Sequence, residues 1–156
     1  MIISWGIPKI KVKGLTIGVN STIDVTFHTP VEDSTQLSME KGDKMEATIE
    51  GGEAEAIKYK RGKYSLEFQV RLGDSHNTWQ IDGTDGVVDG EWSLELEPED
   101  FSNGAPGFKM PKAVCSYEDS YSSADGIMRT YTFESLKPET GKQIQWTGSA
   151  SINATV

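Results

Sequence analysis

Apolar and polar residues alternate with a period of two along much of the chain. In residues 63–72, every second residue from Tyr64 to Leu72 is apolar, and the residues between them are polar or charged. Because successive side chains of a β-strand point to opposite faces of a sheet, this pattern predicts a strand with one buried and one hydrated face. The same alternation predicts strands at Met45, Ala47 and Ile49; at Trp92, Leu94 and Leu96; at Ile23, Val25 and Phe27; at Ile127, Tyr131 and Phe133, where Arg129 interrupts the apolar face; and at Ile144 and Trp146. Residues 8–12 and 111–117 carry weaker strand patterns.

Glycine-containing turn signals separate these runs, among them Gly51-Gly52, Asp85-Gly86 and Asp125-Gly126. We expect residues 53–71 to form a hairpin that turns at Lys60-Arg61-Gly62, where a charged tip joins two alternating segments. Residues 97–101 combine proline and acidic side chains, which suits one short helical turn.

Alternating strands joined by short turns predict a mainly β chain that folds as an antiparallel β-sandwich or barrel, with one short helix at most. The 156 residues fit a single domain, 1–156, that is large enough to bury a core. The pattern does not distinguish a sandwich from a barrel. The hydrated strand faces carry mixed but mostly acidic charge, which is typical of solvated sheet or of a channel wall.

Charge and cysteine content narrow the function classes. The net charge of −9, from 15 basic and 24 acidic residues, disfavours binding to duplex nucleic acid, because phosphate binding needs Lys and Arg. Cys115 is the only cysteine, so an intrachain disulfide is excluded, and its apolar neighbours predict a small core residue. We expect neither a signal peptide nor a membrane segment, since no apolar run approaches 18 residues.

The sequence offers no convincing catalytic or metal centre. His28 and His76 lie in unrelated polar contexts, and no GxSxG or phosphate-binding glycine motif is present. Glu95 and Glu97 share a strand face at a spacing that glycosidases use, but any acidic strand face offers such a pair. The segment from Asp82 to Asp89 is similar to a calcium loop, yet its twelfth position is Ser93, so turn chemistry is the better interpretation. We therefore expect no enzyme activity, cofactor or metal.

Several stretches together resemble structural proteins of prophages from gut Bacteroides-type bacteria and, more widely, phage tail tube proteins. The stretches are Ile3-Ser4-Trp5-Gly6; residues 29–37; Lys41-Gly42-Asp43-Lys44 with Glu50-Gly51-Gly52-Glu53; Asp85-Gly86-Val87-Val88; Leu96-Glu97-Pro98-Glu99-Asp100; and Leu136-Lys137-Pro138 with Gly141-Lys142. Together they span most of the chain.

This resemblance implies a tail-tube-type β domain with a flanking helix. Six copies would form a ring whose inner wall is a continuous β-barrel, and rings would stack into a virion tail, assembled in the bacterial cytoplasm, with other tail proteins as partners. DNA would pass through without specific binding, because an acidic lumen repels phosphates. Type VI secretion tubes share this architecture. The lumen candidates are Glu46, Glu50, Glu67, Glu95 and Glu97, and the inter-subunit loop candidates are Glu32, Asp33, Lys41, Lys60 and Arg61.

Two other classes remain open on the sequence. A ligand- or carbohydrate-binding β-sandwich would use Trp79, Trp92 or Trp146 as stacking platforms, although the alternating phase of Trp92 and Trp146 favours core burial. A hydrolase built on the acidic pair would lose its activity in a Glu95→Gln variant.

Overall fold

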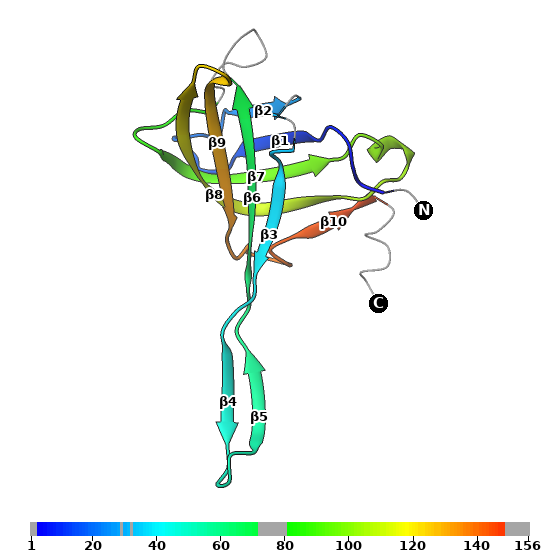
Figure 1. The fold of residues 1–156 in the computed structure, drawn as a ribbon, viewed down its shortest axis with the longest axis vertical. Coiled ribbons are helices and arrows are strands. Elements are labelled where there is room, and N and C mark those ends of the chain that lie inside the picture. Colours follow the sequence, from blue (N-terminus) through cyan, green and yellow to red (C-terminus); the bar gives the residue numbers. More distant parts are fainter. Residues whose placement is uncertain (1–2, 29, 32, 72–80, 149–156) are drawn as a thin grey trace.

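The structure is a computed structural model that describes residues 3–28, 30–31, 33–71 and 81–148. Figure 1 shows a body of curved strands from which one two-stranded ribbon projects. The elements are β1 (Lys9–Gly14), β2 (Asp24–Phe27), β3 (Gln36–Glu40), β4 (Lys44–Thr48), β5 (Ala54–Tyr59), β6 (Lys63–Arg71), β7 (Val87–Glu97), the 3-10 turn η1 (Phe101–Asn103), β8 (Gly107–Ser122), β9 (Gly126–Ser135) and β10 (Gln145–Thr147).

The body is one antiparallel sheet with the strand order β2-β1-β7-β8-β9-β6-β3, and β10 pairs with β8. The sheet curls without closing, because β2 and β3 each have a hydrogen-bonded neighbour on one side only among the residues that the structure describes. Side chains connect β2 to β6 and β9 across the core instead. The ring of Phe27, on β2, lies 5.1 Å from the ring of Phe68, on β6, and 5.5 Å from that of Tyr131, on β9. The expected mainly β, antiparallel fold is confirmed.

The core fills the inner face of this curled sheet. On β6, Leu66, Phe68 and Val70 are buried and the residues between them face outward, as the alternation predicts. Each such apolar side chain contributes roughly 1.5–3 kcal/mol on full burial. The buried set also includes Ile10, Val12, Phe27, Ile81, Val88, Trp92, Leu94, Phe108, Met110, Ala113, Cys115, Tyr117, Tyr131, Phe133 and Ile144. The predicted burial of Trp92 and Cys115 is confirmed.

The Asp85-Gly86 dipeptide forms the turn that the sequence predicts. Asp85 and Gly86 have φ values of 50° and 91° and form a two-residue hairpin turn, in which Thr84 and Val87 exchange both backbone hydrogen bonds. Glycine and aspartate tolerate this left-handed conformation best. The loop is therefore a turn, in line with the sequence interpretation.

The predicted hairpin over residues 53–71 is wrong. β5 pairs with β4, whereas β6 pairs with β3 and β9, so residues 60–62 are not a turn. The turn lies instead at Gly51-Gly52, whose φ values are 99° and 86°. Residues 60–62 run beside residues 41–43, at the point where the projecting ribbon leaves the body.

Two smaller expectations also change. The helical turn predicted at residues 97–101 begins later, as the 3-10 turn Phe101–Asn103. Among the described residues it is the only helical element, so the flanking helix typical of tail tube proteins is absent from this part of the chain. No helix in the described ranges is long and apolar enough to cross a membrane.

Candidate assembly surfaces

The projecting ribbon, which we call the arm (residues 44–59), is the most unusual feature of the molecule. It consists of β4 and β5 joined through Gly51-Gly52, and every residue of both strands is exposed. The apolar residues Met45, Ala47 and Ile49, predicted to belong to a half-buried strand, lie here without any cover from the body. That prediction is wrong for an isolated protomer. Alternation reports an apolar strand face, and it does not say which molecule covers that face.

Both faces of the arm combine apolar and charged side chains. Directly opposed residues share a face of the ribbon, and the register pairs Met45 with Lys58 and Glu46 with Ile57. Large apolar side chains are about half exposed on the arm: 44% for Met45, 47% for Ile49, 51% for Ile57 and 49% for Tyr59. A lone two-stranded hairpin is marginally stable in water. The arm therefore has the composition of a segment that a second molecule covers.

The arm joins the body through a neck (residues 41–43 and 60–62) in which two backbones approach closely. A Cβ added to Gly42 would lie 2.0 Å from the carbonyl oxygen of Lys60, and one added to Gly62 would lie 2.2 Å from that of Glu40. Only glycine fits at such an approach. The backbone N–H of Lys60 donates to the carbonyl oxygen of Asp43 at 2.8 Å, and this hydrogen bond connects the two segments of the neck where the arm begins.

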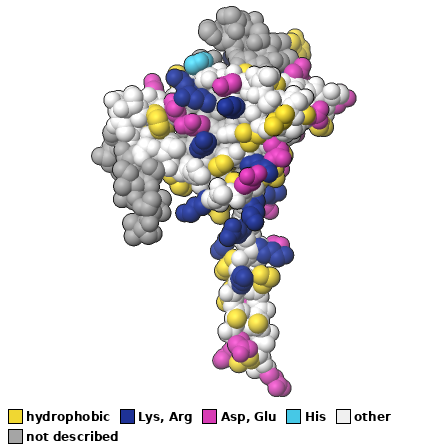
Figure 2. Space-filling model, turned by 180° about the vertical axis from the view of Figure 1, so that it is seen from behind, with side chains coloured by type: hydrophobic (Ala, Val, Ile, Leu, Met, Phe, Trp, Pro, Cys, Tyr) yellow, Lys and Arg dark blue, Asp and Glu magenta, His cyan; other side chains and the backbone are white. Residues whose placement is uncertain are grey.

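Charge is distributed unevenly along the arm. Figure 2 shows basic side chains gathered where the arm leaves the body and acidic side chains at its far end. The basic residues at or beside the neck are Lys41, Lys44, Lys58, Lys60, Arg61 and Lys63, which outnumber the acidic Asp43 and Glu46 there, and the acidic residues toward the turn are Glu50, Glu53 and Glu55. Lys44 and Glu46 form an ion pair at 3.1 Å. The arm thus has a basic root and an acidic tip.

The structure separates the predicted inter-subunit residues. Lys41, Lys60 and Arg61 lie together in the neck, at the root of the arm rather than at a loop tip. Asp33 lies in the segment before β3, with a φ of 57°. Glu32 lies outside the described residues.

The five lumen candidates do not share one surface. Glu46 and Glu50 belong to the arm, whereas Glu67, on β6, and Glu95 and Glu97, on β7, lie on the outer face of the body. The sequence placed all five glutamates on hydrated strand faces, because the alternation of apolar and polar residues is the same in the arm as in the body.

Lysines on β1 balance the acidic residues of β7. Across the strands, Lys9 is opposite Glu97 and Lys11 is opposite Glu95. The Nζ of Lys11 lies 2.8 Å from the Oε1 of Glu97, and this hydrogen bond raises the pKa of Lys11. This part of the outer face is therefore mixed in charge rather than mainly acidic. Glu67 is different, because its cross-strand neighbours are Gln36 and Thr132.

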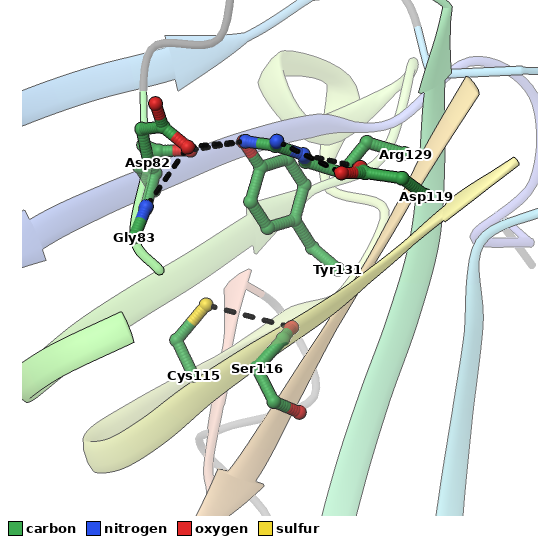
Figure 3. Close-up of polar contacts among 8 residues, drawn as sticks. Asp82, Gly83, Cys115, Ser116, Asp119, Arg129 and Tyr131 are labelled. Atoms are coloured by element: carbon green, nitrogen blue, oxygen red, sulfur yellow. Dashed lines mark hydrogen bonds and ion pairs between the residues drawn. The ribbon is translucent and has the colours of Figure 1, made fainter. Parts of the chain in front are cut away.

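A buried arginine organises the end of the body that lies away from the arm. In the sequence, Arg129 stands out only as an interruption of the apolar face of its strand. Arg129 is 4% exposed on the inner face of β9. Its Nε lies 2.7 Å from the Oδ1 of Asp119, and its NH1 lies 2.9 Å from the Oδ1 of Asp82 (Figure 3). Its guanidinium also lies 3.9 Å from the ring centre of Tyr117. The only signal in the sequence is a charged residue in the apolar phase of a strand, because the two aspartates that bond it lie 10 and 47 residues away along the chain.

The electrostatics of this cluster suit a structural clamp. Burial alone would lower the pKa of Arg129, but hydrogen bonds with Asp119, Tyr131 and Asp82 outweigh burial and hold that pKa above its ordinary value. The Gly83 backbone N–H, and then Arg129, lower the pKa of Asp82. The Tyr131 hydroxyl donates to the carbonyl oxygen of Ile81, which ties the segment before β7 to β9.

Stability is expected to fall at alkaline pH, because burial raises the pKa of the Cys115 thiol and of the Tyr131 hydroxyl to about 12 each. The unfolded chain releases these protons from their ordinary values of 9.0 and 10.0, while the folded chain keeps them until about 12. The free energy of unfolding then decreases with rising pH, by about 1.4 kcal/mol per pH unit for each group. Urea unfolding from about pH 8 to about pH 11 measures this slope. In Cys115→Ala, the decline should begin about one pH unit later; an unchanged onset would contradict the assignment.

The other candidate sites do not converge on chemistry. The buried Cys115 thiol, with its raised pKa, is a poor nucleophile. His28 is exposed at the end of β2, and His76 lies outside the described residues. No group of three His, Cys, Asp or Glu suited to a metal occurs among the described residues.

The predicted tryptophan platforms are not assembled into one surface. Trp92 is 1% exposed, and Trp79 lies outside the described residues. Trp146 is 45% exposed, so its predicted core burial is wrong. Its ring packs edge-on against that of Phe108, with 5.9 Å between the ring centres. A comparison with protein-family models and with curated protein sequences finds no match for this chain.

Proposed function

We propose that this chain is a structural subunit that assembles with copies of itself into stacked rings, and that these rings form the tail tube of a phage or prophage. The arm is the observation that supports this most strongly. It exposes Met45, Ile49, Ile57 and Tyr59 on a ribbon that the body does not support. Contact with another protomer would cover these side chains and order the arm.

The unclosed sheet supports lateral association. Within the described part of the chain, β2 and β3 are the edges at the two ends of the strand order, and unpaired edges are templates for pairing with another chain. Joining the β2 edge of one copy to the β3 edge of the next would continue the sheet from protomer to protomer. Such a head-to-tail contact produces a ring when the rotation closes.

The sequence resemblance supplies the finer proposal of a six-membered ring, a DNA-conducting lumen and other tail proteins as partners. Glu67 is the best lumen residue of the original five, since no lysine lies opposite it on β3 or β9. The arm, which projects away from the body, would reach the adjacent ring. Its acidic tip and basic root suit a contact in which the tip of one copy meets the neck of another.

Reversing the charge of the arm tip is expected to weaken association. In Glu50→Lys/Glu53→Lys, the tip would repel the basic neck, and two exposed charge contacts account for a loss of about tenfold in association constant at low salt. Sedimentation velocity over a concentration series measures this association constant. Glu118→Lys/Glu134→Lys, on the outer face of the body, is the matched control. Equal association of the tip variant and the wild type would overturn the tip-to-neck contact, and a wild type that never associates would overturn the function.

A further inference from the structure

A second protruding apolar feature lies at one end of β1. The loop between β1 and β2, which we call the knob (residues 15–19), exposes Leu15, Ile17 and Val19 by 42%, 92% and 57%. Surface loops are normally polar at their tips, so three exposed aliphatic side chains in five residues point to contact with another molecule.

The body holds the knob rigidly. Asn20, which is 2% exposed, accepts a hydrogen bond at Oδ1 from the backbone N–H of Thr16 at 2.8 Å. Its Nδ2 donates to the carbonyl oxygen of Glu91, on β7, at 3.1 Å, and the backbone N–H of Glu91 donates to the Thr16 hydroxyl at 2.9 Å. A buried asparagine with both ends of its amide bonded fixes a single loop conformation. The aliphatic side chains are therefore presented in a preorganised form, which lowers the entropic cost of binding.

An apolar pocket lies at the other end of β1. Its volume is about 750 Å³, and its lining includes Trp5, Ile7, Val31, Leu37, Leu66 and Phe108. Trp5 and Ile7 are 68% and 61% exposed, so the pocket is open to a partner. A volume of this order accommodates several aliphatic side chains.

The knob and the pocket of one protomer cannot meet. Pro8 lines the pocket and the knob begins after Gly14, so all of β1 separates them, about 20 Å at strand rise. In Figure 1, β1 runs across the direction of the arm. A knob on one side and a receptive pocket on the other are the elements of a head-to-tail contact between copies.

The charges at the two sites are compatible. Among the described residues that line the pocket, Asp33 is the only charged one, and the Glu99 side chain lies against Gly6, another lining residue. The knob carries no charge, and the exposed Lys13 precedes it on β1. Docking would bring this lysine toward the acidic side of the pocket without placing like charges together.

We propose that the knob of one copy docks in the pocket of the next copy and forms the lateral contact within each ring. This inference rests on the proposed self-assembly and assigns surfaces to it. A standard interface buries about 800 Å² on each partner, more than three side chains supply. The knob therefore sets the geometry of the contact, and the free edges of β2 and β3 and the arm contribute the remaining area.

Cross-linking of paired variants tests this contact directly. Ile17→Cys places a thiol on the knob and Ile7→Cys places one at the pocket, both at exposed positions that leave the core intact. The native Cys115 is 6% exposed and adds little reactivity. With a short bis-maleimide, a mixture of the two variants is expected to give covalent dimers, while each variant alone gives at least tenfold fewer. In the matched control, Ile127→Cys, 43% exposed on β9, replaces the knob thiol.

The outcomes distinguish this inference from the proposed function. Wild-type assembly without cross-linking of the mixture would overturn the knob contact alone. Cross-linking of the mixture together with a wild type that forms no larger species would support the contact and overturn the tube. If a small apolar probe, 1-anilinonaphthalene-8-sulfonate, fills the pocket in assembled wild type and in an Ile17→Asp variant alike, the pocket is a ligand site and the inference is wrong.

Discussion

Replacing the arm, residues 44–59, by an Asn-Gly turn is expected to abolish self-association while the body stays folded. Asp43 and Lys60 already face each other across a backbone hydrogen bond of 2.8 Å, so a two-residue turn can connect them. All strand residues of the arm are exposed, and its removal opens no cavity in the core. Sedimentation velocity measures the association, and thermal unfolding followed by circular dichroism measures the fold. The expected change in melting temperature is small.

A surface variant serves as the control for loss of exposed apolar area. Tyr121→Ser removes an aromatic ring that is 74% exposed near the end of β8, far from the arm in sequence. This variant should associate like the wild type. An arm-deleted protein that still forms rings or tubes would refute the central role of the arm, and an unfolded one would show that the arm belongs to the folding unit.

Removing the buried guanidinium is expected to destabilise the body by about 3 kcal/mol in an Arg129→Ala variant. Hydrogen bonds to charged groups contribute about 1.5–3 kcal/mol each, and a desolvated cation–π contact about 2 kcal/mol. The net loss is smaller than the sum of these contributions, because the Asp82 and Asp119 side chains are 60% and 50% exposed and water can solvate them once the arginine is gone. Urea unfolding at neutral pH provides the measurement.

A conservative variant separates the charge from the geometry of the clamp. Arg129→Lys keeps the positive charge but lacks the planar guanidinium, which bonds Asp119 and Asp82 at the same time. This variant should therefore recover less than half of the free energy of unfolding that Arg129→Ala loses. Asp119→Asn should cost less than Arg129→Ala, since the carboxylate is half exposed. A change below about 0.5 kcal/mol for Arg129→Ala would show that the cluster is not a clamp.

Local chemistry made much of the fold predictable. The alternation around Phe68 and around Leu94 identifies β6 and β7 correctly, because a half-buried strand needs that period. Asp85-Gly86 forms its turn because both residues tolerate positive φ. The sequence also indicates a mainly β chain, since no apolar pattern of helical period competes with these strands.

The errors arise where the environment of a strand is not local. Met45 and Ile49 alternate like core residues, yet they lie on the arm, where any cover must come from another molecule. Gly62 carries the signature of a turn, but here it permits two backbones to run close together in the neck. Arg129 and Asn20 are buried because partners distant in sequence satisfy them, and no periodicity reports such partners.

Electron microscopy of the purified protein, in a series of increasing concentrations, tests the central claim most directly. Self-assembly through the arm and the lateral surfaces predicts rings with a central hole that stack into tubes at high concentration. The arm-deleted variant, imaged in parallel, should show neither. Single protomers at every concentration of the wild type would contradict the account and would favour a ligand-binding β domain.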